Sequence, residues 1–381
     1  MGINIRESQE HIVKLTREQF KLLQYLSQTR KALISGGAGT GKTMLAFQKA
    51  LLLARQGFDT LFTCPNKLLA DSLAFQAEGV ENLTVLNFHQ LCYRWGRQAG
   101  IPDLVDPDGP GRERMLQEYF DKTLPEALLQ ALDLIPARFD AIIVDEGQDM
   151  NAEWWDILKL SMKDYDAGIF YIFYDQHQTI WYKDNRLPLE VEPVTLVENL
   201  RNSKAIYRLL SKYYKGKGDC YQGCGPEGGG IEYLAVDAAD PGALIRVLSS
   251  LLHRLIEKEK VKPCHIAILT GTSKGNSALA GAAKIGRYPL VDRCLDGEEQ
   301  IFFSSIRRFR GMERPVVILI ELEELFSPDR MRETLGKRLQ CRPEDLPGIA
   351  RETLYIGLSR AQTHLYIIGT PQTIKAIQDQ A

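Results

Sequence analysis

The sequence predicts an α/β protein of two domains, each built around a parallel sheet. The first observation behind this class is that short apolar runs alternate with helical segments of about 10–15 residues, the pattern of βαβ units. The second is a glycine-rich loop that joins a predicted strand to a predicted helix near residue 40. The third is the length of 381 residues, which suggests two or three domains at about 150 residues each.

The first half of the chain holds one series of apolar runs. We expect strands at residues 31–35, 58–64, 83–87, 140–145 and 168–174. Helices are expected at 42–56 and 66–77, between the first three of these strands. The segment 185–194 holds two prolines and no helical period, so we place a domain boundary there. The first predicted domain therefore covers residues 1–188.

A second series of apolar runs follows this boundary. We expect strands at residues 194–198, 231–236, 264–270, 301–304, 315–321 and 364–369. Residues 322–350 are charged, helical in period and without a strand pattern, which indicates an insertion. The second predicted domain, with this insertion, covers residues 189–381.

The composition is that of a folded globular protein. Hydrophobic residues make up 44% and charged residues 25%, which excludes a disordered or fibrous chain. Lys+Arg is 47 and Asp+Glu is 49, for a net charge of −2, so any contact with nucleic acid must come from local patches. Seven scattered cysteines favour a reducing, cytoplasmic location. We find no secretory signal and no apolar run of about 18 residues, and expect no membrane partner.

The glycine-rich loop matches the pattern G-x-x-x-x-G-K-[ST] in the strand–loop–helix context that the pattern requires. Its residues are Gly36, Gly37, Ala38, Gly39, Thr40, Gly41, Lys42 and Thr43. The glycines let backbone N–H groups surround phosphates, and the helix N-terminus adds its dipole. We expect ATP here, with Lys42 on the β- and γ-phosphates and the Thr43 hydroxyl on Mg²⁺.

An acidic string, residues 145–149, follows the predicted strand 140–145. Side chains at the carboxyl end of a parallel strand face the ligand crevice. We expect Asp145 to bind Mg²⁺, through water, and Glu146 to orient or deprotonate the attacking water. A merely acidic loop after a strand is the alternative, and the phosphate loop weighs against it.

The two motifs and their neighbours resemble the ATPase core of superfamily 1 helicases of the UvrD/Rep type. Six strings in the family's order carry the resemblance: 15–19, 145–149, 174–178, 199–202, 305–313 and 355–361. The resemblance implies two tandem RecA-like P-loop domains with ATP between them. The chain also resembles the compact helicase half that is found attached to nuclease-related domains.

The resemblance implies several further nucleotide contacts. Gln19 stands where the family reads adenine, and Gln178 where it senses the γ-phosphate. Gly311 and Glu313 match the string T-x-H-x-x-K-G-L-E. We count all four as candidate nucleotide-site residues.

Two arginines stand where the family places groups that reach across the domain cleft, Arg201 and Arg360. As arginine fingers they would neutralise charge developing on the transferred phosphoryl group; surface ion pairs are the alternative. The sequence departs from the family at Arg307 and Arg310, where His and Lys are usual, and at Tyr174, where Gly is common.

A track for single-stranded nucleic acid is implied by the same resemblance. Trp181 lies where the family stacks a base, and stacking is worth about 1–3 kcal/mol per base. Core packing is the alternative for Trp181, and a structural role is the alternative for Phe88 and His89. The full candidate set is Asn66, Lys67, Phe88, His89, Trp181, Ser305, Arg307 and Arg310.

The chain lacks room for the large insertions of full-size UvrD-like helicases, because residues 90–144 and 202–304 are short for them. Accessory subdomains are therefore expected to be minimal or absent. We expect a helicase-type ATPase stimulated by single-stranded DNA, with RNA open as another strand. The alternative is an ATP-dependent switch that acts on a protein partner such as a nuclease. A small-molecule kinase would leave Arg201 and Arg360 unexplained.

Overall fold

The computed structural model describes residues 19, 22–24, 26–109, 117–136, 138–178, 187–214, 222–227, 229–240, 242–293, 298–331 and 343–379. The chain divides into two compact units. The N-terminal unit comprises residues 18–36 and 42–196, and the C-terminal unit comprises residues 197–381 together with loop residues 37–41.

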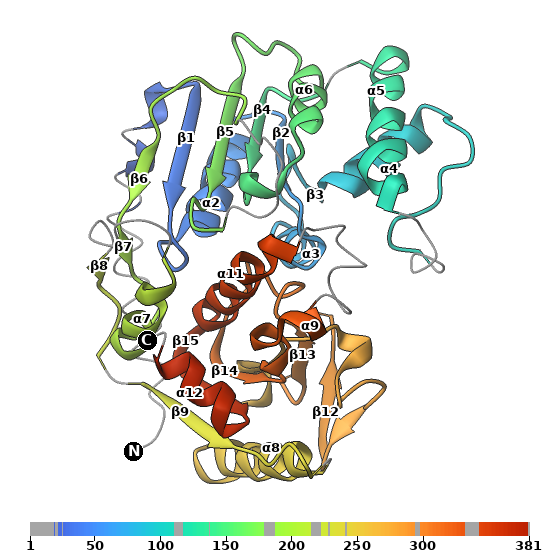
Figure 1. Cartoon of the computed structure of the whole chain (residues 1–381). Helices are drawn as coiled ribbons and strands as arrows, with labels where there is room; N and C mark the ends of the chain where they lie inside the picture. Colours follow the sequence, from blue (N-terminus) through green and yellow to red (C-terminus); the bar gives the residue numbers. More distant parts are fainter. Residues whose placement is uncertain are drawn as a thin grey trace. The chain divides into compact units, whose positions relative to one another are not determined.

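The N-terminal unit is built on a six-stranded sheet in the order β3-β2-β4-β5-β1-β6, and all neighbouring strands are parallel. The strands are β1 (Lys31–Gly36), β2 (Thr60–Cys64), β3 (Leu83–Asn87), β4 (Ala141–Val144), β5 (Ile169–Tyr174) and β6 (Val194–Leu196). The helices are α2 (Lys42–Arg55), α3 (Lys67–Gln76), α4 (Phe88–Gln98), α5 (Leu124–Leu134) and α6 (Ala152–Leu160). Figure 1 shows the helices on both faces of this sheet.

Apolar side chains on both faces explain why these strands are continuous apolar runs. Side chains alternate across a strand. In β4, Ile143 packs with α2 and α3, and Ile142 packs with α4, α5 and α6. In β5, Phe173 packs with α2 and α3, and Phe170 packs with α4, α5 and α6. Burial on both faces is typical of parallel sheets.

The C-terminal unit has a seven-stranded sheet in the order β11-β12-β13-β10-β14-β15-β9, parallel except for the β11–β12 pair. Its strands are β9 (Gly230–Ala235), β10 (Ile266–Thr270), β11 (Lys284–Ile285), β12 (Tyr288–Val291), β13 (Ile301–Ser305), β14 (Arg314–Ile320) and β15 (Ala361–Gly369). A small parallel pair lies outside this sheet: β7 (Glu198–Asn199) and β8 (Gln222–Gly223). The helices are α7 (Lys204–Leu210), α8 (Ala243–His253), α9 (Pro328–Met331), α11 (Leu346–Ser359) and α12 (Pro371–Asp379).

The predicted fold class is confirmed: the protein is α/β, and its parallel sheets fit RecA-like P-loop domains. One assignment is corrected, because the run 194–198 does not open the second domain. Its first part, β6, pairs with β1, so the N-terminal unit extends to Leu196 instead of ending at 188. The β11–β12 hairpin was not predicted, since both strands are short and one holds a proline. In the segment 322–350, the described residues form no strand, as expected, and 332–342 lie outside the description.

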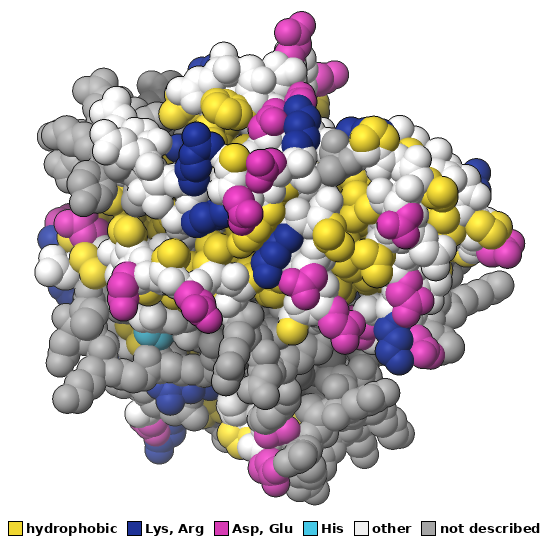
Figure 2. Space-filling model, turned by 90° about the horizontal axis from the view of Figure 1, so that it is seen from above, with side chains coloured by type: hydrophobic (Ala, Val, Ile, Leu, Met, Phe, Trp, Pro, Cys, Tyr) yellow, Lys and Arg dark blue, Asp and Glu magenta, His cyan; other side chains and the backbone are white. Residues whose placement is uncertain are grey.

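The amino-terminal edge of the N-terminal sheet mixes charges of both signs. Figure 2 views the molecule from the top of Figure 1 and shows Lys/Arg and Asp/Glu side chains interspersed with hydrophobic ones. At the starts of β2 and β4, Lys163 lies 2.5 Å from an Asp59 carboxylate oxygen and 3.0 Å from one of Asp140.

Within the described part of the chain, none of the helices has the length and apolar character of a transmembrane segment.

Candidate nucleotide site

The phosphate loop lies where the sequence predicts it, between the end of β1 and the start of α2. Gly39 and Gly41 have φ values of +83° and +85°, a left-handed region that glycine adopts without penalty. A Cβ atom at Gly39 would also lie 2.5 Å from the Asn199 side chain. Glycine is therefore required at the tip of the loop for both conformation and space.

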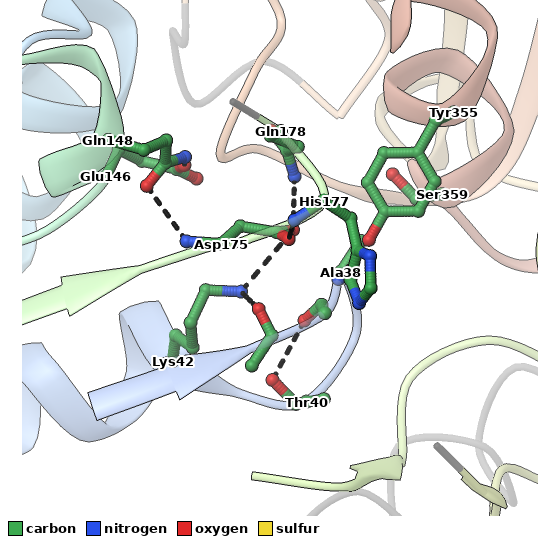
Figure 3. A network of polar contacts seen from close by, with 12 residues as sticks. Ala38, Thr40, Lys42, Glu146, Gln148, Asp175, His177, Gln178, Tyr355 and Ser359 are labelled. Carbon is green, nitrogen blue, oxygen red and sulfur yellow. Dashed lines mark hydrogen bonds and ion pairs between the residues drawn. The ribbon is translucent and has the colours of Figure 1, made fainter. Parts of the chain in front are cut away.

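Lys42 begins α2 and points back along the loop (Figure 3). Its Nζ donates to the Gly36 carbonyl at 2.8 Å and lies 3.7 Å from Asp175 Oδ2. Lys42 is 7% exposed and Asp175 is fully buried, so the ion pair is little screened by water. The loop lysine is thus held beside a carboxylate that follows β5.

Asp145 stands directly after β4 and is fully buried. Burial first, and then the neighbouring Glu146 charge, raise the pKa of Asp145 to about 7, while Thr43 and Lys42 oppose the rise. Neither Asp145 oxygen has a partner at hydrogen-bond distance among the described residues, although the Thr43 hydroxyl and the Glu146 backbone N–H are close enough to lower its pKa. A buried carboxylate with unsatisfied oxygens beside a hydroxyl fits a hard cation such as Mg²⁺.

Glu146 occupies an unusual backbone position at the same sheet edge. Its φ and ψ are 53° and 40°, a left-handed conformation that is uncommon for a residue other than glycine. The side chain is 5% exposed, and its Oε2 accepts a hydrogen bond from Gln148 Nε2 at 2.5 Å. Gln178 approaches the same region through Asp175, to whose Oδ2 its Nε2 donates at 2.6 Å (Figure 3).

The tip of the phosphate loop bonds to residues of the C-terminal unit, to which it belongs by its contacts. Asn199 Nδ2 donates to the Ala38 carbonyl at 2.9 Å, and the Leu200 N–H donates to the Gly39 carbonyl at 3.0 Å. The Ala38 N–H donates to the Tyr355 hydroxyl at 2.7 Å. The string 199–202 thus contacts the phosphate loop through Asn199 and Leu200.

Asn199 also bonds to a second buried amide, Asn202. Asn199 Nδ2 donates to Asn202 Oδ1 at 2.8 Å, and the Asn202 N–H donates to Asn199 Oδ1 at 3.0 Å. Asn202 Nδ2 donates in turn to the carbonyls of Ser359 and Ala361 at 3.1 and 2.6 Å. This asparagine pair links the loop tip to the end of α11.

Arg201 and Arg360 both have partners inside the C-terminal unit. Arg201 Nε forms an ion pair with Glu313, whose other oxygen accepts from Gln362 Nε2 at 2.8 Å. Arg360 is 2% exposed, and its guanidinium donates to the carbonyls of Ile356 and Met312 at 2.9 and 3.2 Å. In this conformation, Arg360 satisfies carbonyls near the end of α11, where a cation also suits the helix dipole.

The N-terminal nucleic-acid candidates have structural partners. Asn66 caps α3 by accepting the Leu68 N–H at 2.9 Å, and Lys67 pairs with Asp71 and Asp108 at 2.9 and 3.0 Å. His89 Nε2 lies 3.1 Å from the Phe120 carbonyl.

Phe88 is fully buried and stacks on Trp154 with ring centroids 4.4 Å apart. A ring packed in this way presents no face to a base. The expectation of a nucleic-acid contact at Phe88 is therefore corrected, and its role in this structure is core packing.

The C-terminal nucleic-acid candidates lie in the turn after β13, which Ser305 ends. Arg307 donates to the Thr353 hydroxyl of α11 at 3.3 Å. Arg310 is 6% exposed and lies 3.7 Å from Glu352. Because its guanidinium faces the interior of the unit, we correct the expectation of a phosphate contact at Arg310.

Three of the predicted positions remain to be placed. Gly311 has φ +74° in the turn before β14. Gln19 is half-buried in a helical segment, and Trp181 lies outside the described residues.

Three residues that contact the candidate site residues escaped the sequence analysis: Asp175, Gln148 and Tyr355. All lie inside strings that carry the resemblance. Asp175 could have been found from its place directly after an apolar strand, the same signal that marked Asp145. The contacts of Gln148 and Tyr355 are tertiary, and no spacing along the chain predicts them.

Residues 2–167, less than half of the chain, match the family described as "Type III restriction enzyme, res subunit". Among solved structures, the chain is similar to the PRRSV helicase, at 11% identity and a TM-score of 0.41, over 91% of this chain and 54% of that one. It is also similar to arterivirus nonstructural protein 10, a helicase, in complex with DNA and alone. Identity is 14% in both cases, with TM-scores of 0.38 and 0.39, over 91% of this chain and 63% and 61% of theirs.

The chain thus spans less than two thirds of each of these helicases. No curated protein matches the chain. With the loop and the carboxylates, the family match supports a helicase-type P-loop core and an ATP-hydrolysing enzyme.

Proposed function

We propose that this chain is an ATP-dependent helicase or translocase of superfamily 1, of the UvrD/Rep type. Single-stranded DNA would stimulate ATP hydrolysis, and hydrolysis would drive translocation or limited unwinding. The observation that carries the proposal is the buried cluster at the carboxyl edge of the N-terminal sheet. There the loop lysine, an unsatisfied carboxylate and a second carboxylate lie together: Lys42, Asp145 and Glu146.

The residues of this cluster divide the chemistry of ATP hydrolysis. Lys42 would exchange Asp175 for the β- and γ-phosphates. Asp145 and the Thr43 hydroxyl would hold Mg²⁺, which when bound supplies charge neutralisation at the phosphates. Glu146 would take the proton of the water that attacks the γ-phosphorus, while the bond to the β–γ bridging oxygen breaks. Gln178 would contact the γ-phosphate.

The C-terminal unit would supply the arginines. Arg201 and Arg360 have to leave Glu313 and the backbone carbonyls to reach a phosphate, so we propose that nucleotide binding rearranges both.

The proposed domain division is two RecA-like domains, with ATP between them. Arg307 and Lys67 support a strand track because each exposes part of its side chain. The widely spaced cysteines of the sequence support a cytoplasmic location.

A displacement assay tests the proposal against the alternative of a protein-directed switch. A translocating protein strips streptavidin from the biotinylated end of a single-stranded oligonucleotide in the presence of Mg²⁺ and ATP. We expect displacement by the wild type and none by Glu146→Gln. If ATP is hydrolysed but streptavidin stays bound at either end of the strand, translocation is refuted and the switch is favoured.

A further inference from the structure

A hydrogen-bonded relay inside the N-terminal unit joins the ends of β4 and β5 through Gln148 (Figure 3). Gln148 Nε2 donates to Glu146 Oε2 at 2.5 Å, and the Asp175 N–H donates to Gln148 Oε1 at 2.9 Å. Gln148 is 6% exposed and Asp175 is fully buried. These bonds are therefore shielded from bulk water. Hydrogen bonds in the protein interior are electrostatically stronger than hydrogen bonds in water. We call these three residues the Gln148 relay.

The orientation of the Gln148 amide is set by the chemistry of its neighbours. An ionised carboxylate only accepts hydrogen bonds, and a backbone N–H only donates them. The NH₂ group must therefore face Glu146, and the carbonyl oxygen must face Asp175. With the amide turned over, both contacts would be repulsive. Gln148 is thus held in one orientation from both ends.

The backbone around Glu146 is held against β5 as well. Glu146 has the left-handed φ of 53°, and such a conformation persists in a non-glycine residue where the surroundings impose it. A Cβ atom at Gly147 would lie 2.5 Å from Ile172 Cγ2, so the backbone packs too closely against β5 to admit a side chain. The Gln148 bond then fixes the rotation of a carboxylate whose backbone is already fixed.

The other end of the relay reaches the phosphate-loop lysine. The Asp175 carboxylate lies 3.7 Å from Lys42 Nζ and accepts hydrogen bonds from Gln178 Nε2 at 2.6 Å and the His177 N–H at 2.8 Å. The residue that receives Lys42 thus also orients the amide that orients Glu146. A change in the partners of Asp175 is passed to Glu146 through one side chain.

We infer that Gln148 is a positioning residue: it aims the Glu146 carboxylate at the attacking water and ties that aim to Asp175. The inference rests on the proposed function, because it requires Glu146 to act on water. Gln148 acts through Glu146 and is not itself a catalytic residue. Misplacement by about 1 Å costs on the order of 10²-fold in rate, so the relay is expected to affect kcat and leave nucleotide binding unchanged.

Two substitutions separate positioning from a structural role. Gln148→Ala removes both bonds. Gln148→Glu keeps an oxygen for the Asp175 N–H, but it loses the donor and sets a second negative charge beside Glu146. If Gln148 served only to anchor Asp175, the glutamate variant would retain activity. We expect both variants to lose on the order of 10²-fold in kcat.

The measurements are steady-state ATP hydrolysis, for kcat and KM, and equilibrium binding of a fluorescent ATP analogue. Unchanged Kd in both variants, within about twofold, would show an intact loop and a folded unit. The matched control is Gln56→Ala, at an exposed glutamine after α2, which should behave as wild type. If the wild type is active and kcat is unaltered in Gln148→Ala or in Gln148→Glu, the inference is overturned and the proposed function stands.

A double variant tests whether Gln148 acts through Glu146. In Glu146→Gln/Gln148→Ala, single-turnover hydrolysis should be as slow as in Glu146→Gln alone, because residues that act as a unit are not additive. A further loss on the order of 10²-fold would contradict the relay. A wild type that hydrolyses no ATP would instead refute the proposed function, and the inference with it.

Discussion

Asp145 is the residue at which stability and the proposed activity oppose each other. Its carboxylate is fully buried beside Glu146, with no hydrogen-bond partner at ordinary distance in the described chain. Burying a charge without a partner is unfavourable, and it is at active sites that such costs are retained. The same unsatisfied oxygens are what a cation would use.

We therefore predict that Asp145→Asn stabilises the Mg²⁺-free protein while weakening Mg²⁺ binding. The neutral amide removes the buried charge and its repulsion from Glu146, so the free energy of unfolding should rise by about 1 kcal/mol. The affinity for Mg²⁺ should fall at least about 10-fold. Chemical denaturation and a Mg²⁺ titration of ATP hydrolysis measure the two effects.

The exposed Asp156→Asn, on α6, is the control, and it should change neither quantity appreciably. Loss of stability in Asp145→Asn would mean that the carboxylate has a structural role in the metal-free protein.

At the scale of elements, the C-terminal unit depends on the asparagine pair that joins β7 to the end of α11. Asn202 donates to two buried carbonyls, of Ser359 and Ala361, and accepts from Asn199. A buried polar group that loses its partner costs about 1–3 kcal/mol. The pair therefore holds the segment around Arg360 in place as well as contacting the loop.

Replacing Asn202 by alanine should lower the free energy of unfolding by about 2–4 kcal/mol, since more than one buried group loses its partner. Urea denaturation measures this change. The exposed Asn276→Ala is the control and should stay within about 0.5 kcal/mol of wild type. Equal stability of the two variants would show that the amide network contributes little to the unit.

The same scale shows what sequence could predict. The eleven predicted apolar runs all contain strands, because burial on both faces leaves an unbroken apolar signal. The sheet to which a strand belongs is a tertiary property, and so β6 was assigned to the wrong domain. Loop and carboxylates were predicted from position after strands. The burial of Phe88 and Arg310 was not, because local sequence does not report which side chains of a helix start or of a turn face the core.

At the scale of the whole molecule, the candidate residues are divided between two units. The N-terminal unit holds Lys42, Asp145 and Glu146, and the C-terminal unit holds Arg201 and Arg360 together with the loop tip. The proposed function requires that a single nucleic-acid strand controls ATP hydrolysis by this protein.

The rate of ATP hydrolysis by the purified chain, with and without a single-stranded DNA oligonucleotide, tests that claim most directly. Glu146→Gln serves as the control, because it keeps the side-chain size while removing the proposed base. We predict that the oligonucleotide raises the wild-type rate at least about 10-fold and that Glu146→Gln abolishes this stimulation. Hydrolysis that neither DNA nor RNA alters, or that survives in Glu146→Gln, would contradict the account.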